Sequence, residues 1–89
     1  MKREEILQKA EEIITGEREH QYGKPENNFS YIANLWTVYL KGTHITSKDV
    51  AIMLILLKIA RTDGNEKYID NYIDICGYAA CAGEVVTNE

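Results

Sequence analysis

The sequence predicts an all-α fold, a single domain of four helices covering residues 1–89, and three observations support this prediction. Apolar residues recur every three to four positions through most of the chain, which is the spacing of one helix face. No stretch alternates apolar and polar residues for long enough to form a strand. Glycines, a proline and capping residues divide the periodic pattern into four segments of helical length.

The first helix is expected over residues 2–15, with isoleucines and an alanine on one face and glutamates largely on the other. Gly16 is expected to end it, because glycine is common just beyond a helix C-terminus. The next stretch, residues 16–26, is polar and contains Gly23 and Pro25. It is therefore expected to form an ordered loop.

The second helix is expected to begin with Asn27 or Asn28 as its N-cap and to end at Gly42. Its aromatic residues recur at helical spacing, so Phe29, Trp36 and Tyr39 are expected in the core. An alternative for Trp36 is that the face of its ring forms the wall of a pocket for a base.

The third helix is expected to follow Thr46, since Thr46 and Asp49 have the spacing of a capping box. The sequence Asp-Gly-Asn at residues 63–65 predicts a turn, and a fourth helix is expected over about residues 66–86. Gly77 lies in the middle of that helix, where glycine costs about 1 kcal/mol relative to alanine. Close packing or a ligand is therefore expected at this position.

The composition excludes two classes of partner. A net charge of −4 argues against sequence-independent binding of duplex nucleic acid, which needs a basic face. The longest apolar run, residues 50–57, has eight residues and is too short to span a bilayer. The first fifteen residues are charged and lack the apolar segment of a signal peptide. We therefore expect a soluble, intracellular protein without a membrane partner.

The same apolar run favours a homo-oligomer. A chain of 89 residues buries a modest fraction of its surface, and residues 50–57 are apolar around the whole helix. We expect a dimer or tetramer in which the copies share one core. Cys76 and Cys81 lie five positions apart on one predicted helix, too far for a disulfide, and are expected to be free, buried thiols.

Two polar groups face each other across the predicted turn between the third and fourth helices. Lys58 and Arg61 share one helix face and suit phosphate, although they could instead stabilise the helix C-terminus and point to water. Asp70 and Asp74, with Asn71 beside them, could hold a divalent metal or accept hydrogen bonds from sugar hydroxyls and base amines. The alternative is an ion pair between these carboxylates and the cations across the hairpin.

Further candidates come from the predicted loop and the fourth helix. His20 and Tyr22 could stack on a base or bind it by hydrogen bonds, the alternative for His20 being a solvated side chain. No phosphate-binding glycine loop, zinc-site spacing or Ser-His-Asp arrangement is found, so no catalytic or metal-binding residue is assigned. One ligand pocket is expected, lined by His20, Tyr22, Asn28, Trp36, Lys58, Arg61, Asn71, Asp74 and Tyr78.

Five short motifs together resemble the pattern of a known family. They read His-x-Tyr-Gly, Asn-Phe with Ile-Ala-x-Leu-Trp, Asp-Val-Ala, Lys-Ile-Ala-Arg, and Asp-Asn-x-x-Asp-x-x-Gly-Tyr-Ala-Ala. In this chain they lie at residues 20–23, 28–36, 49–51, 58–61 and 70–80. The pattern resembles that of small phage and prophage proteins of unassigned function, and the match spans about residues 17–84. It is specific for the family and does not specify a function.

More remotely, the helical layout is similar to the MazG-type all-α nucleoside triphosphate pyrophosphatases. Those proteins bind Mg²⁺ through Glu-x-x-Glu on one helix and Glu-x-x-Asp on another. The resemblance implies an Mg²⁺-dependent pyrophosphohydrolase, in which Asp70, Asp74 and Glu11 or Glu12 would hold the metal and water would be the nucleophile. The chain departs from that pattern, since Thr15 stands where a second carboxylate would be expected.

By size and context, the chain also looks like the compact oligomeric proteins with which phages sequester cyclic nucleotide signals of bacterial immune systems such as CBASS. That analogy implies tight binding of a cyclic oligonucleotide, such as a cyclic dinucleotide, without turnover and without a cofactor, in the cytoplasm of a bacterial host. Sequestration is our first hypothesis and the pyrophosphohydrolase our second. The third is a helical protein-interaction module whose polar patch only fixes helix register.

Overall fold

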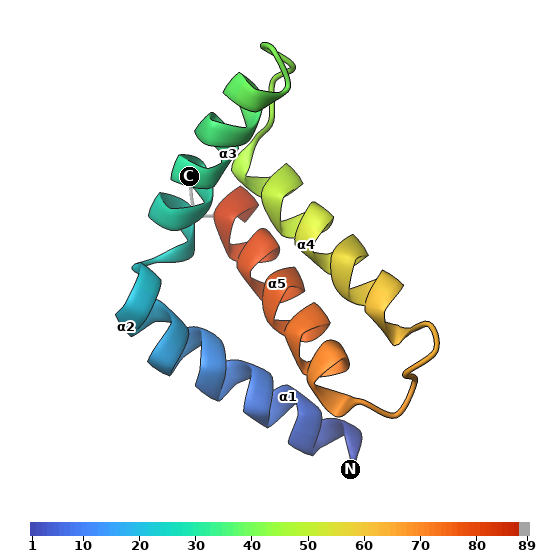
Figure 1. Cartoon of the computed structure of the whole chain (residues 1–89). Coiled ribbons are helices and arrows are strands. Elements are labelled where there is room, and N and C mark those ends of the chain that lie inside the picture. Colours follow the sequence, from blue (N-terminus) through green and yellow to red (C-terminus); the bar gives the residue numbers. More distant parts are fainter. Residues whose placement is uncertain (88–89) are drawn as a thin grey trace.

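The computed structural model describes residues 1–87 as an arrangement of helices (Figure 1). These are α1 (Arg3–Glu12), the π-helical segment η1 (Ile13–Glu17), α2 (Arg18–Tyr22), α3 (Pro25–Tyr39), α4 (Ser47–Thr62) and α5 (Ile69–Thr87). The first three follow one another directly and form one rod, so residues 1–87 make four rods. No strand occurs within residues 1–87, and the predicted all-α fold is confirmed.

The first rod is longer than predicted, and the prediction of a loop at residues 16–26 is wrong. Gly16 has no positive φ and lies within η1, where a wide turn accommodates it. The helix ends instead at Gly23, whose φ of 83° is a conformation that other residues rarely adopt. A helical glycine costs about 1 kcal/mol, and packing of this rod against α5 offsets that cost.

The second rod begins earlier than predicted. Its N-cap is Lys24, with Pro25 as the first helical residue, so the prediction of Asn27 or Asn28 as N-cap is wrong. Proline suits this position, because it has no N–H to leave unpaired and its φ is already helical. The helix ends before Gly42, whose φ is 91°, as predicted.

The predicted capping box at the start of α4 is confirmed. The Asp49 backbone N–H donates to Thr46 Oγ1 at 3.1 Å, and the Thr46 N–H donates to Asp49 Oδ2 at 3.0 Å. The hydrogen bonds from Thr46 lower the pKa of Asp49. The fourth rod begins at Ile69, three residues later than predicted, because the turn continues through residues 63–68.

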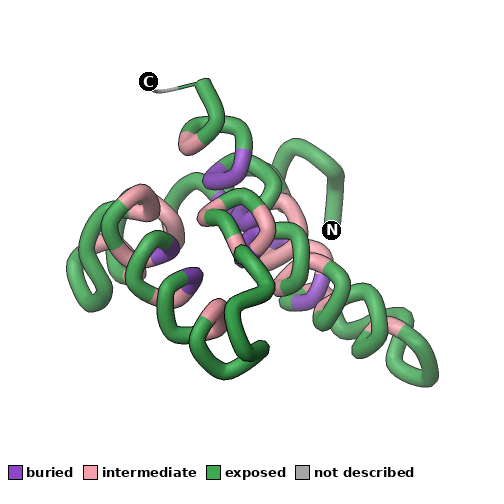
Figure 2. The backbone as a smooth tube through the Cα atoms, turned by 90° about the horizontal axis from the view of Figure 1, so that it is seen from above, coloured by how far each residue is buried: buried purple, intermediate pink, exposed green. Residues whose placement is uncertain are grey.

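The helices α4 and α5 form the central antiparallel hairpin of the molecule (Figure 1). The first rod packs on one side of α5, and α3 packs mainly on the N-terminal half of α4. The main buried cluster lies where α3, α4 and the C-terminal half of α5 meet, and it includes Phe29, Val50, Ala51 and Tyr78. Buried positions are few along the described chain, as Figure 2 shows.

At Gly77 the first rod packs tightly against α5. Gly77 is buried, and a Cβ atom built on it would lie 2.9 Å from Cγ2 of Ile14. The expected close packing at this glycine is therefore confirmed. Cys81 is also buried in α5, and burial raises the pKa of its thiol. Both cysteines are free, as predicted, but Cys76 is only partly buried.

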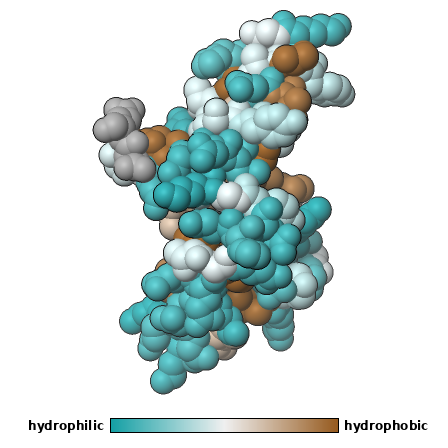
Figure 3. Space-filling view, turned by 90° about the vertical axis from the view of Figure 1, so that its left-hand side faces the viewer, coloured by the Kyte–Doolittle hydropathy of each residue, from teal (hydrophilic) through white to brown (hydrophobic). Residues whose placement is uncertain are grey.

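The surface is not uniformly polar. On the face shown in Figure 3, hydrophilic residues cover the lower part, and apolar residues gather toward the end where α3 turns into α4. Val38 and Tyr39 near that end expose 77% and 83% of their surface. The expectation that Tyr39 lies in the core is therefore wrong, because Tyr39 is the last residue of α3 and lies beyond the buried part of that helix. None of the helices within residues 1–87 combines the length and the apolarity that a bilayer crossing requires.

Candidate functional site

A polar hollow of about 380 Å³ opens at the end of the α4–α5 hairpin that holds the turn. It contains four of the nine residues predicted for the ligand pocket, Lys58, Arg61, Asn71 and Asp74. Its other lining residues are Asn65, Tyr68 and Asp70. The last turn of α4, the connecting turn and the first turns of α5 thus bring these side chains together, and we call this site the polar hollow.

An ion pair crosses one wall of the polar hollow. Lys58 Nζ lies 2.8 Å from Asp74 Oδ2, and both side chains are largely buried, at 16% and 17% exposed. The other carboxylate oxygen of Asp74 lies 3.9 Å from a guanidinium nitrogen of Arg18. For Lys58, the structure therefore shows the ion pair that the sequence left open as an alternative to a phosphate contact.

Asn71 joins the two helices beneath the hollow. It is 4% exposed, and its Nδ2 donates a hydrogen bond to the backbone carbonyl of Arg61 at 3.3 Å. The last carbonyls of a helix have no partner within it, so this amide satisfies one of them. The donor of Asn71 is thus used to fix the hairpin.

The Arg61 guanidinium is the available cation of the hollow. Arg61 is exposed, and no salt bridge within residues 1–87 includes it. Across the hollow, a hydrogen bond with Asp70 raises the pKa of the Tyr68 phenol. Lys58 and Asp74 neutralise each other, so Arg61 and Asp70 remain as single charges of opposite sign.

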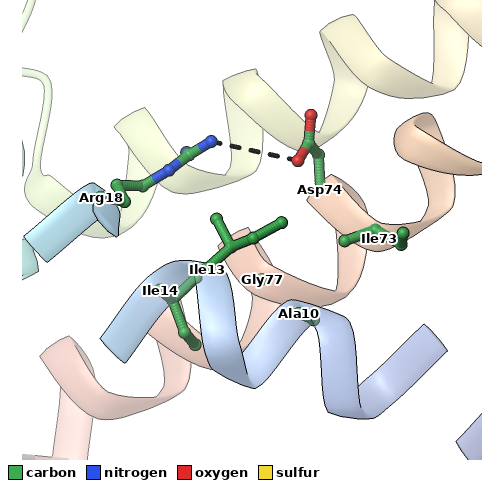
Figure 4. Close-up of a pocket in the computed structure, with 7 residues that line it drawn as sticks. All are labelled: Ala10, Ile13, Ile14, Arg18, Ile73, Asp74 and Gly77. Carbon is green, nitrogen blue, oxygen red and sulfur yellow. Dashed lines mark ion pairs between the residues drawn. The ribbon is translucent and has the colours of Figure 1, made fainter. Parts of the chain in front are cut away.

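Arg18 is a site residue that the sequence analysis missed. Its guanidinium reaches toward Asp74 (Figure 4) and also lies 4.8 Å from the centre of the Tyr78 ring, within the range of a cation–π contact. It was missed because residues 16–26 were predicted to be a loop. The spacing of four between Ile14 and Arg18 was the available signal, since it continues the helical pattern past Gly16.

A second hollow, of about 490 Å³ and lined mostly by apolar atoms, lies on the other side of Arg18. Three predicted residues line it, Tyr22, Asn28 and Tyr78. We call it the aromatic groove. The single pocket predicted from the sequence is therefore divided into two hollows, with Arg18 between them.

Two predicted residues line neither hollow. His20 is exposed on α2, in agreement with the solvated alternative. Trp36 packs against the main buried cluster, in agreement with its default role in the core. No three His, Cys, Asp or Glu side chains gather at one point in the part of the chain that the structure describes.

The fold and the polar hollow define a small all-α protein with an open site of mixed charge. The chain belongs to the family described as "Domain of unknown function (DUF6378)", which matches residues 5–86. The sequence-based resemblance to a phage protein family of unassigned function is confirmed by two similar proteins. No solved structure matches the chain.

Both similar proteins are named "Gene 55 protein". The one from Mycobacterium phage L5 is 50% identical over 74 residues, which cover 83% of this chain and 47% of the relative. The one from Mycobacterium phage D29 is 43% identical over 82 residues, which cover 92% of this chain and 54% of the relative. This chain thus spans about half the length of the curated relatives that it matches.

Proposed function

We propose that this protein binds a phosphodiester-containing nucleotide at the polar hollow and sequesters it without turnover. The proposed guest is a cyclic oligonucleotide of the kind that bacterial immune systems use as signals. The observation that carries the proposal is the exposed Arg61 guanidinium, which lines an open hollow and has no carboxylate partner within residues 1–87. Arginine suits this role because its planar guanidinium can bind two phosphate oxygens at once.

The charge balance of the hollow favours a phosphodiester over a triphosphate. Lys58 is held by Asp74 at 2.8 Å, so one cation, Arg61, is available to an incoming anion. Asp70 adds a negative charge to the lining. A triphosphate would bring several charges against this single cation, whereas each phosphodiester of a cyclic oligonucleotide brings one.

The remaining groups suit a nucleoside. Asp70 can accept hydrogen bonds from a ribose hydroxyl or a base amine, and Tyr68, which is 51% exposed, offers a ring face. A volume of about 380 Å³ is near the lower end of typical ligand pockets, which suits one nucleotide unit of a larger guest. The phage origin of the two similar proteins fits sequestration of a host signal in the bacterial cytoplasm.

Calorimetric titration with cyclic dinucleotides, cyclic trinucleotides and ATP, with and without Mg²⁺, tests the proposal. We expect a cyclic oligonucleotide to bind, and Arg61→Ala to weaken its binding. A charge-assisted hydrogen bond contributes about 1.5–3 kcal/mol, so Kd should rise about 10- to 150-fold. Arg3→Ala is the matched control, because Arg3 is also an exposed arginine but lies on α1, outside the hollow. This control should leave Kd unchanged.

The fate of the ligand separates the hypotheses. The protein is incubated with the nucleotide and Mg²⁺ and is then heated to release what it holds. Recovery of intact cyclic nucleotide supports sequestration. Monophosphate and pyrophosphate from ATP would instead support the pyrophosphohydrolase, and the absence of binding to every nucleotide would leave the interaction module. An Arg61→Ala variant that is folded and binds as tightly as the parent would remove the phosphate assignment.

A further inference from the structure

The outer face of α4 carries an apolar stripe that no other part of the described chain covers. Its members form pairs at helical spacings of three and four positions, so together they cover one side of the helix. Each exposes between 41% and 57% of its surface. The stripe consists of Ile52, Met53, Leu56, Leu57 and Ile59. We call it the α4 stripe.

We propose that the α4 stripe is covered by the α4 stripe of a second copy of this chain, in a two-fold symmetric, antiparallel dimer. A two-fold interface uses the same patch on both subunits, so a self-complementary patch is required. The α4 stripe meets this condition because residues 50–57 contain no charged side chain. Two copies can therefore approach without burying an unpaired charge.

The charges at the two ends of the stripe select the antiparallel arrangement. Lys48 lies at the N-terminal end of α4 and Asp63 directly follows its C-terminal end, and both are exposed. Helical spacing places both residues on the same side of the helix as Leu56. In an antiparallel pair, Lys48 of each subunit meets the Asp63 end of the other. A parallel pair would set Lys48 against Lys48 and Asp63 against Asp63.

The exposed area of the α4 stripe is about half of what a stable dimer needs. At these exposures, the α4 stripe offers about 450 Å² per subunit, roughly half of the ~800 Å² that each partner buries in a standard interface. Apolar side chains are also exposed on α3, where Leu35 and Tyr31 expose 52% and 65% of their surface. The exposed side chains of α3 can supply the remaining area.

The monomer also has a reason to dimerise. Nine hydrophobic residues are buried among those described, and four of them are alanines, so the chain encloses little apolar volume by itself. Its Cα radius of gyration is 13.7 Å, whereas about 12 Å is typical of a compact domain of this length. Covering the α4 stripe would enlarge the core without any rearrangement of the helices.

The proposed dimer leaves the polar hollow open. Lys58 and Arg61 both line the hollow. Lys58 lies on the side of α4 opposite Leu56, whereas Arg61 follows the stripe residue Leu57 by four positions and therefore lies at the edge of the stripe. Each subunit would therefore keep its own hollow. Leu56 itself lies away from both cations, so loss of the dimer in Leu56→Glu and loss of nucleotide binding in Arg61→Ala are separate results.

Sedimentation equilibrium of the full chain and of two matched variants tests the dimer. The parent should have at least twice the 10.2 kDa mass of one chain. Leu56→Glu should reduce it to one chain while the helical circular dichroism is kept. Leu7→Glu is the control, since Leu7 is 59% exposed and Leu56 is 57% exposed, but Leu7 lies on α1. This control should keep the mass of the parent.

Charge reversal keeps the proposal testable if Leu56→Glu fails to fold. Lys48→Glu should raise the dimer dissociation constant several-fold, and the additional change Asp63→Lys should restore it. A parent that stays monomeric at about 100 μM would overturn the proposal, because interfaces of standard size have dissociation constants in the micromolar range or below. So would a Leu56→Glu variant that keeps the parent mass, or a double charge variant without recovery.

Discussion

The contact between Gly77 and Ile14 allows a quantitative prediction for a single added methyl group. In Gly77→Ala, the new Cβ would lie 2.9 Å from Ile14 Cγ2, closer than real Cβ contacts allow. Overpacking of this kind costs about 1–3 kcal/mol, whereas alanine in a helix gains about 1 kcal/mol over glycine. The free energy of unfolding should therefore fall by about 0–2 kcal/mol.

Gly83→Ala is the matched control on the same helix, because a Cβ at Gly83 meets nothing within 4 Å. It should gain up to about 1 kcal/mol from helix propensity alone. Urea unfolding at one fixed protein concentration measures the free energy of unfolding of both variants. In a thermal melt, a difference of about 1 kcal/mol would correspond to about 4–8 °C in Tm.

Removal of the Ile14 methyl group completes the test. In an Ile14→Ala background, Gly77→Ala should no longer destabilise the protein, and a double-mutant cycle isolates the coupling between the two positions. If Gly77→Ala stabilises the parent as much as Gly83→Ala does, the first rod does not pack against α5 as described, and the reasoning is refuted.

Two further predictions concern the hairpin and the cap of α4. Asn71→Ala should cost about 1–3 kcal/mol in urea unfolding, because the carbonyl of Arg61 loses its partner; an unchanged midpoint would contradict this role. The lowered pKa of Asp49 means that its stabilisation is present above the unfolded pKa of about 3.9 and is lost as pH falls through the folded pKa. The stability of Asp49→Asn should therefore depend less on pH below about pH 4 than the stability of the parent. Thermal unfolding at a series of pH values measures this difference.

Most of the fold could be predicted because local signals and packing agree over most of the chain. In α4, the capping box at Thr46 is a local signal for a helix, and the apolar residues favour the same helix through their packing. The first rod is where they disagree. Gly16 has the local signal of a helix end, but the contact of Arg18 with Asp74 and the packing of Ile14 on Gly77 carry the helix further. Such tertiary contacts are not visible in local sequence.

The part of the candidate site on the α4–α5 hairpin was predictable from the sequence, but the pairing of its side chains was not. Spacing placed Lys58 and Asp74 near each other, but sequence alone could not decide whether they bind each other or a ligand. That choice depends on side-chain distances after the hairpin closes. The separation of the aromatic groove from the polar hollow could not be predicted either. It depends on the position of Arg18, which the sequence placed in a predicted loop.

The π-helical turn at Ile13–Glu17 makes the first rod tolerant of a change in length. Such a wide turn contains one residue more than an α-helical turn. The side chains before and after it therefore point to the same sides of the helix as they would without the extra residue. In a regular helix, one added residue would rotate every later side chain by about 100° around the axis. A chain shorter by one residue at this turn would thus still direct Arg18 toward α5.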